Sequence, residues 1–243
     1  MATRLVFVHG GLHTGGCWAD TIDVIAALRP DIETLVVDLP GRRSVPGDLA
    51  YLTIDDCVCG VTQQITGHIP GDGPLVLVGH SLAGVILSGV VNRLGIDRVP
   101  HVIFVACCVP ADGECVLDTL PFGLKRVVRH LVNRAPVIDR IPPGLVRYCF
   151  SNCATSGHRA KIKQGIVPES SALLTQAQVG GFPGSMRTSW IVTRRDRALP
   201  EAKQRAFIQN LGGVDDLVCI DAGHEVMITH PWELASALIA LTG

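Results

Sequence analysis

The chain of 243 residues has few aromatic residues, no long apolar segment and almost no net charge. No apolar run approaches the roughly 18 to 20 residues that a membrane-spanning helix requires. The formal net charge of −1 predicts no whole-protein attraction to nucleic acid or to a membrane surface. The first residues also lack the charged and apolar regions of a signal peptide. We therefore expect a cytoplasmic protein with no nucleic-acid or membrane partner.

The cysteine pattern lacks the spacing of a disulfide framework or of a structural zinc site. Nine cysteines are an odd number, and several, such as Cys107 and Cys108, lie in apolar runs typical of small core residues. The stretch Cys57–Cys59, and Cys149–Cys153 with His158, contain possible zinc ligands but no paired C-x2-C spacing. We expect free cysteines, no metal and no cofactor.

Short apolar, β-branched runs alternate with helical patterns along most of the chain, which is 47% hydrophobic and can bury a full α/β core. The expected strands are Leu5–Val8, Thr34–Val37, Leu75–Val78, Val102–Val105, Ser189–Thr193 and Leu217–Ile220. The expected core helices are Cys17–Leu28, Ile54–Ile69, Leu82–Leu94, Glu201–Asn210 and Trp232–Leu241. Such alternation predicts an α/β fold, with a doubly wound parallel sheet of roughly six strands and helices on both faces.

The alternation stops between Pro110 and Gly184, a stretch too long to be a plain loop in a compact domain. It contains helical patterns at Leu124–Val132 and His158–Ile166. We expect residues 110–184 to form a small helical cap inserted into a core of residues 1–109 and 185–243. Because ligands of open α/β sheets bind beyond the carboxyl ends of the strands, a cap placed there would cover the site.

The expected cap also carries the one charge asymmetry of the chain. Against the single acid Asp139, residues 124–163 contain Lys125, Arg126, Arg129, Arg134, Arg140, Arg147, Arg159, Lys161 and Lys163. One interpretation is a solvated surface. The other is attraction of an acidic substrate or of an acidic carrier protein.

A pentad of the G-x-S-x-G type, Gly79–Ala83, has alanine in its last position and Gly84 directly after it, and it stands between an expected strand and an expected helix. A sharp strand-to-helix turn needs small residues beside it and leaves the serine oxygen exposed. Ser81 is therefore the candidate nucleophile. The turn also points backbone N–H groups toward whatever the serine attacks.

A serine nucleophile needs an imidazole to take its proton and a carboxylate to orient that imidazole. Asp196 follows the fifth expected strand and His224 the sixth, in the order Ser, Asp, His. Asp221 is a competing acid, but it is too close to His224 to need a loop of its own. Other histidines are weaker candidates for the base: His9, His13 and His80 are expected to shape the site, and His230 to cap a helix.

The oxyanion formed by attack on a carbonyl needs two fixed hydrogen-bond donors. One expected donor is the backbone N–H of Leu82, directly after the nucleophile. The other should come from the glycine-rich loop after the first strand, where Gly11 is the first choice and Leu12 the second.

These motifs together resemble the α/β-hydrolase superfamily, and within it the small-cap branch of plant methylesterases, hydroxynitrile lyases and their bacterial relatives. The resemblance lies in Phe7–Gly11 through Trp18, Asp38–Gly41, Gly79–Gly84, Thr193–Asp196 and Ala222–His224. It implies ester hydrolysis without a cofactor, on a small or medium apolar ester or thioester, through an acyl-enzyme. The weaker candidates for its substrate pocket are His9, Gly10, Leu12, His80 and Glu225.

Three positions separate esterases from lyases in this resemblance. The lyases have threonine at the position of Gly10, lysine at that of Glu225 and often an acid at that of His80. All three departures favour ester hydrolysis. The alternatives that stay open are a thioesterase or lactonase acting on a biosynthetic intermediate, a non-hydrolytic ligand-binding receptor with the same fold, and a lyase. The oligomeric state is not readable from the sequence.

Overall fold

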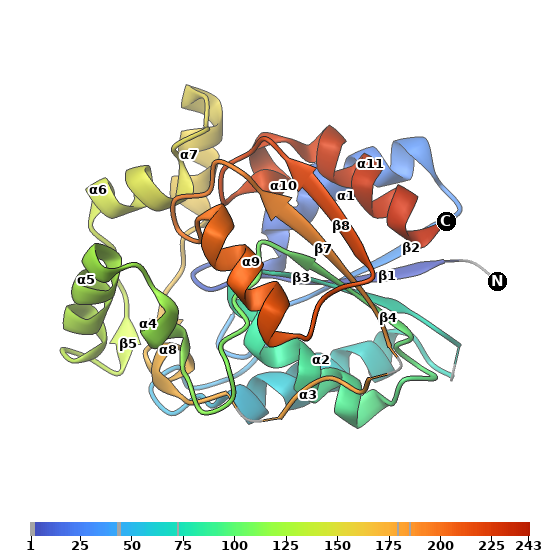
Figure 1. Ribbon diagram of the computed structural model, residues 1–243, viewed down its shortest axis with the longest axis horizontal. Helices are drawn as coiled ribbons and strands as arrows, with labels where there is room; N and C mark the ends of the chain where they lie inside the picture. The colour runs from blue at the N-terminus through green and yellow to red at the C-terminus, as the bar shows by residue number, and fades with distance from the viewer. Residues whose placement is uncertain (1–2, 43–44, 72, 179, 185) are drawn as a thin grey trace.

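A six-stranded, fully parallel sheet forms the centre of the molecule (Figure 1). The structure is a computed structural model that describes residues 3–42, 45–71, 73–178, 180–184 and 186–243; two expected domain limits, Met1 and Ser185, lie outside them. The strands are β1 (Arg4–Val8), β2 (Glu33–Val37), β3 (Val76–His80), β4 (His101–Val105), β7 (Arg187–Thr193) and β8 (Asp216–Ile220). Their order across the sheet is β2-β1-β3-β4-β7-β8, which confirms the expected doubly wound sheet.

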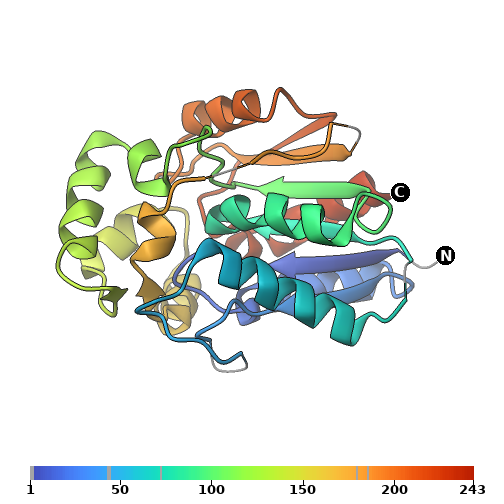
Figure 2. The ribbon, with the colours of Figure 1, turned by 90° about the horizontal axis from the view of Figure 1, so that it is seen from below.

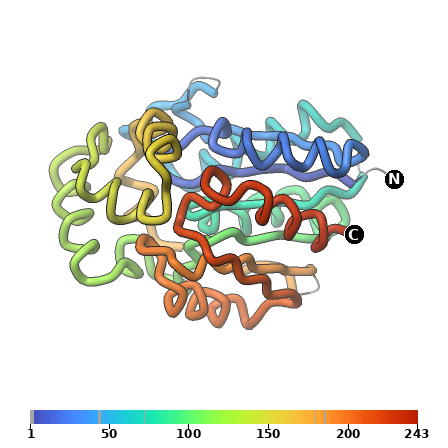
Figure 3. The backbone as a smooth tube through the Cα atoms, turned by 90° about the horizontal axis from the view of Figure 1, so that it is seen from above, coloured from blue at the N-terminus to red at the C-terminus, as the bar shows by residue number. Residues whose placement is uncertain are grey.

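Helices cover both faces of the sheet and divide the core into two apolar layers. The core helices are α1 (Ala19–Leu28), α2 (Ile54–His68), α3 (Gly84–Leu94), α9 (Glu201–Asn210) and α11 (Pro231–Thr242), with the single turn α10 (Val226–Thr229) before the last. One layer packs residues of α2, α3 and α9 against the sheet, and the other packs residues of α1, α10 and α11. Figure 3 shows α1 and α11 side by side on their face.

The strands form where the sequence is most apolar, because a strand between two helical layers is buried on both sides. In β4, all five residues are buried. The helix starts follow local rules: Thr53 and Asp56 form a capping box at α2, and Pro231 occupies the first turn of α11. Two expected helices begin later than predicted, because 3₁₀ turns at Gly15–Trp18 and Ser81–Ala83 precede α1 and α3.

The chain between β4 and β7, residues 106 to 186, is called here the β4–β7 segment. Its helices and short strands lie beyond the carboxyl ends of the core strands (Figures 1 and 2), and the chain then returns to the opposite edge of the sheet, where β7 begins beside the start of β4. Two of its helices correspond to the expected patterns. Its elements are α4 (Val116–Thr119), α5 (Phe122–Val132), β5 (Val137–Ile138), α6 (Pro143–Leu145), a π turn (Val146–Phe150), α7 (Ser156–Gly165), β6 (Glu169–Ser170) and α8 (Ala172–Thr175). The short strands β5 and β6 pair only with each other, in a separate antiparallel ribbon.

Among the described residues, no helix combines the length and the hydropathy needed to cross a membrane. All nine cysteines are free. Within the same described ranges, no group of three or more His, Cys, Asp or Glu side chains is arranged to hold a metal ion.

Candidate active site

Ser81 stands at the turn that joins β3 to α3, with its backbone in the left-handed region at φ 52°. A non-glycine residue in this region is strained, and such strain is found at functional turns. The turn is held by the amide of Cys108, which donates a hydrogen bond of 2.8 Å to the Ser81 carbonyl. The side chain of Ser81 stays half-buried at the edge of a cavity, as the pentad predicts.

Three glycines around this turn have no room for a side chain. A Cβ on Gly79 would lie 2.6 Å from the Cδ1 of Leu87, and a Cβ on Gly84 would overlap the Cys108 carbonyl. A Cβ on Gly10 would lie 2.8 Å from the Cβ of Ser81 itself. The small residues of the pentad and of the first loop are therefore needed by the packing of the turn.

Ser81, His224 and Asp196 form one continuous chain of hydrogen bonds. The Nε2 of His224 is 2.9 Å from the Oγ of Ser81, and its Nδ1 is 2.7 Å from the Oδ2 of Asp196. Because a carboxylate oxygen only accepts, Nδ1 carries the proton and Nε2 is left to accept from the serine hydroxyl. The structure thus brings together the three residues that were predicted from the sequence, which follow three different strands.

The carboxylate of Asp196 is fixed by four hydrogen bonds. Besides His224, its Oδ2 accepts from the hydroxyl of Thr193 at 3.0 Å. Its Oδ1 accepts from the amides of Ala198 and Leu199, both at 2.8 Å. The side chain is only 5% exposed, so these bonds replace the water that burial removes.

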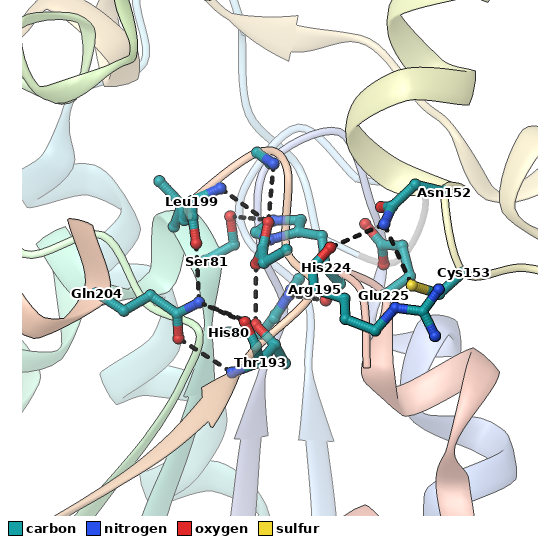
Figure 4. A network of polar contacts seen from close by, with 12 residues as sticks. His80, Ser81, Asn152, Cys153, Thr193, Arg195, Leu199, Gln204, His224 and Glu225 are labelled. Carbon is teal, nitrogen blue, oxygen red and sulfur yellow. Dashed lines mark hydrogen bonds and ion pairs between the residues drawn. The ribbon is translucent and has the colours of Figure 1, made fainter. Parts of the chain in front are cut away.

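Gln204 of α9 lies beside this loop, between Leu199 and Thr193 (Figure 4). Its side chain is fully buried and donates to the Thr193 carbonyl at 3.1 Å and to the Leu199 carbonyl at 2.8 Å. It also accepts from the Thr193 amide at 3.2 Å. One side chain therefore ties both ends of the loop that carries Asp196.

The environment of His224 suits a base. Burial alone lowers its pKa, but the negative charge and hydrogen bond of Asp196, with a smaller contribution from Glu225, raise the pKa above the usual 6.5. His80 is different: burial, and then the charge of His224, hold its pKa well below the usual value. Its neutral ring donates from Nε2 to the His224 carbonyl at 3.0 Å, which positions the backbone of this candidate base.

The loop after β1 is fixed by a neutral His9. The amide of Leu39 donates to its Nε2 at 3.1 Å, so the proton is on Nδ1, which donates to the Gly10 carbonyl at 2.7 Å. Burial and then the charge of Arg42 lower the pKa of His9 to about 3, and the ring stays neutral near pH 7.

The two candidate donors of that loop differ in their surroundings. Leu12 has φ 65°, and its amide donates to the carboxylate of Glu169 at 2.9 Å. Its carbonyl accepts from the amide of Val167 at 2.9 Å. Because the Leu12 amide is already engaged, Gly11 is the better candidate for the oxyanion hole, together with Leu82; both border the cavity.

A mainly apolar cavity opens above Ser81, between the sheet and the β4–β7 segment. The space that the centre of a water molecule can reach in it is about 120 Å³. Most of its wall comes from the segment: Cys108, Val116, Leu120, Leu124, Val128, Leu131, Ile138, Ile141, Leu145, Cys149, Phe150, Glu169 and Leu174. Burial raises the pKa of the Cys149 thiol to about 11 and that of Cys108 to about 12, so both thiols stay protonated near pH 7 and Ser81 remains the candidate nucleophile.

Of the five weaker pocket candidates, only Leu12 borders this cavity among the described residues. His9, Gly10, His80 and Glu225 are buried in the layer behind the loop and the hydrogen-bonded chain. Both carboxylate oxygens of Glu225 lack a hydrogen-bond partner within the described part of the chain; its Oε2 is 3.5 Å from the Nε2 of His13.

The competing candidates lie elsewhere. The Asp221 side chain is 74% exposed and lies 3.9 Å from an Arg195 nitrogen. His230 is half-buried at the start of α11, where it contacts the hydroxyl of Thr229 at 2.9 Å. None of the basic side chains singled out in residues 124–163 borders the cavity among the described residues. On α5 the apolar side faces the cavity, while Arg126 and Arg129 are exposed.

Sequence reasoning missed a buried ion pair beside the site. The Nη2 of Arg42 is 2.6 Å from the Oε2 of Glu169, and both side chains are 1% exposed. No motif marks either residue, because the pair joins positions 127 residues apart. Gln204 could have been found: it shares a face of α9 with the buried Phe207, an unusual place for a polar residue.

A model of the family described as "Alpha/beta hydrolase family" matches residues 5–237. Among curated proteins, the probable esterase PIR7A of Oryza sativa subsp. indica is 24% identical over 268 residues, covering 98% of this chain and 96% of that protein. A carbendazim hydrolyzing esterase from Nocardioides sp. is 25% identical over 253 residues, covering 98% and 99%.

Solved structures with the same fold cover nearly the whole chain. An extracellular alpha/beta-hydrolase from a Paenibacillus species aligns with a TM-score of 0.84 at 20% identity, covering 99% of both chains. The methylesterase MES16 from Arabidopsis aligns with a TM-score of 0.79 at 18% identity, covering 98% of both chains.

Proposed function

The chain belongs to the alpha/beta hydrolase family, and on that premise we propose that it is a carboxylic ester hydrolase with Ser81 as its nucleophile. The observation that carries this proposal is the unbroken hydrogen-bonded chain from Asp196 through His224 to Ser81, which ends at a cavity. The names of similar proteins, among them esterases from Oryza sativa and Nocardioides, support the same reaction class.

The geometry supports a two-step mechanism. The Ser81 oxygen attacks the ester carbonyl while Nε2 of His224 takes its proton and then passes it to the leaving alcohol. Asp196 holds the ring in the required tautomer and stabilises the imidazolium. The amides of Gly11 and Leu82 donate to the oxyanion. Water then attacks the acyl-enzyme, with His224 again as the base, and releases the acid.

The wall of the cavity supports an apolar substrate of small or medium size. Residues 110–184 act in this proposal as a cap, because most of the cavity wall comes from them. Hydroxynitrile-lyase chemistry is less well supported. The resembling lyases have threonine where this chain has Gly10, and a side chain there would meet Ser81.

The test is turnover by the wild type and by Ser81→Ala on 4-nitrophenyl esters of increasing acyl length. We expect the variant to lose about four to six orders of magnitude in kcat. Ser236→Ala, on the exposed side of α11, is the matched control and should keep full activity. Equal turnover by Ser81→Ala would refute the mechanism.

A fluorophosphonate probe separates the enzyme from a ligand-binding receptor of the same fold. We expect the probe to label the wild type and Ser236→Ala but not Ser81→Ala, because only an activated serine reacts. A wild-type protein that folds, binds esters and stays unlabelled would favour the receptor.

A further inference from the structure

One side chain of the cavity wall does not fit an apolar pocket. Among the described residues that form the wall, Glu169 in β6 is the only one with a carboxylate side chain. Its exposure is 1%. A buried carboxylate is costly unless it is paired, so its place in this wall calls for a specific role.

The carboxylate is held in one orientation by three donors. Its Oε2 accepts from the Nη2 of Arg42 at 2.6 Å and from the Leu12 amide at 2.9 Å. Its Oε1 accepts from the Ser170 amide at 2.9 Å. An ionised carboxylate can accept about four hydrogen bonds, so these three leave one acceptor position for a donor in the cavity.

The same carboxylate lies beside the loop that is proposed to bind the oxyanion. A Cβ built on Gly11 would be 3.3 Å from the Oε2 of Glu169. A negative charge at this place opposes the charge that develops on the substrate carbonyl, and Arg42 offsets it. An apolar residue would avoid this conflict but would leave Arg42 and the amides of Leu12 and Ser170 without their acceptor. Besides these three bonds, the carboxylate offers the wall a free acceptor position, which an apolar side chain does not have.

We propose that Glu169 is a specificity-determining residue that accepts a hydrogen bond from a substrate hydroxyl close to the ester carbonyl. The inference rests on the proposed ester hydrolysis and names its substrate class: esters of 2- or 3-hydroxy acids whose remaining part is apolar. The hydroxyl faces Glu169, next to the Gly11 loop, and the apolar part lies against Leu124, Val128 and Leu131. A deoxy ester leaves the buried acceptor unpaired, which lowers its rate roughly 10- to 100-fold.

The experiment compares kcat/KM for methyl 2-hydroxyhexanoate and methyl 3-hydroxyhexanoate with that for methyl hexanoate. For the wild type we expect one of the two hydroxy esters to exceed the deoxy ester by roughly 10- to 100-fold. The double variant Arg42→Met with Glu169→Met removes both charges of the pair together, which buried pairs tolerate better than loss of one partner. In it we expect the ratio to fall to about one.

The ratio, and not the absolute rate, is the readout, because any shift of the Leu12 loop lowers turnover of all three esters alike. Glu169→Gln is the second variant, for use if the double variant does not fold. It keeps the size of the side chain but removes the charge, and it should lower the ratio several-fold. Glu225→Gln is the matched control: this second buried carboxylate does not border the cavity, so the ratio should stay at its wild-type value.

A wild-type ratio near one, or the wild-type ratio in a folded Glu169 variant, overturns the role of Glu169. Those results leave ester hydrolysis standing if turnover still depends on Ser81. If the wild type cleaves 4-nitrophenyl esters but none of these three esters, only the substrate class proposed here fails. If it cleaves neither kind of ester, or if Ser81→Ala cleaves them equally well, the proposed function itself fails.

Discussion

The central sheet and the β4–β7 segment follow different physical rules. Strand β4 is buried along its whole length, and Ser81, Asp196 and His224 follow the ends of β3, β7 and β8. Helix α5 in the segment, in contrast, has no buried residue, and its neighbours are single turns and two-residue strands. The sheet fixes the proposed reacting groups through dense packing, whereas α5 supplies wall side chains that are not part of the core. Changes at the sheet should therefore stop the reaction, and changes in the segment should alter its selectivity.

The largest effect expected within this comparison is that of Asp196→Asn. The amide cannot hold His224 in the tautomer that accepts the serine proton, so kcat should fall by about 10⁴. Steady-state kinetics on a 4-nitrophenyl ester measure the loss. Asp221→Asn, at the competing acid, is exposed and should retain wild-type activity. A larger loss in Asp221→Asn than in Asp196→Asn would transfer the orienting role to Asp221.

The pH dependence of activity tests His224 and Asp196, which follow β8 and β7. His224 must be neutral to accept the serine proton, and Asp196 and Glu225 raise its pKa above 6.5 against the effect of burial. Activity should therefore be lost as the pH falls through a value above 6.5, about tenfold for each unit below it. Other groups facing His224 are Ser81, the neutral His80 and the ring of Phe150.

Glu225→Gln removes one of the two charges that raise the pKa of His224. The acid limb of kcat/KM should move to lower pH in this variant, whereas Asp221→Asn should leave it in place. A limb that stays fixed in Glu225→Gln would show that Asp196 alone sets the basicity of His224.

The two regions also differ in how far the sequence predicts them. The pentad and the order Ser81, Asp196, His224 are local signals, because parallel strands end on the same edge of a sheet and bring the residues after them together. Glu169 and Arg42 carry no such signal: each is one charged residue in a loop or a short strand, and only the fold brings them within 2.6 Å. Single turns such as α4 and α8 escaped prediction because a few residues contain no periodicity to recognise.

A smaller effect is expected from two neighbouring valines of α5. Val128 borders the cavity, whereas Val127 is 39% exposed and does not. Val128→Ala removes two methyl groups from the wall, so kcat/KM for esters that reach it should fall roughly 4- to 10-fold, with shorter esters unaffected. Val127→Ala should keep the wild-type profile across acyl lengths. Equal profiles for the two variants would mean that α5 does not contact the acyl chain.

The smallest effect is expected from the charges on the outer side of the segment. Arg126, Arg129 and Arg134 are exposed and do not border the cavity, so reversing all three to Glu should change kcat/KM for neutral esters less than about twofold. If an acidic substrate or carrier approaches over this surface, turnover of an acyl-coenzyme A thioester should fall several-fold more at low salt. That difference should disappear above about 0.15 M salt, where charges more than about 8 Å apart are screened. Equal losses of kcat/KM on both substrates would show that these arginines form only a solvated surface. Selectivity would then depend on the residues that line the cavity.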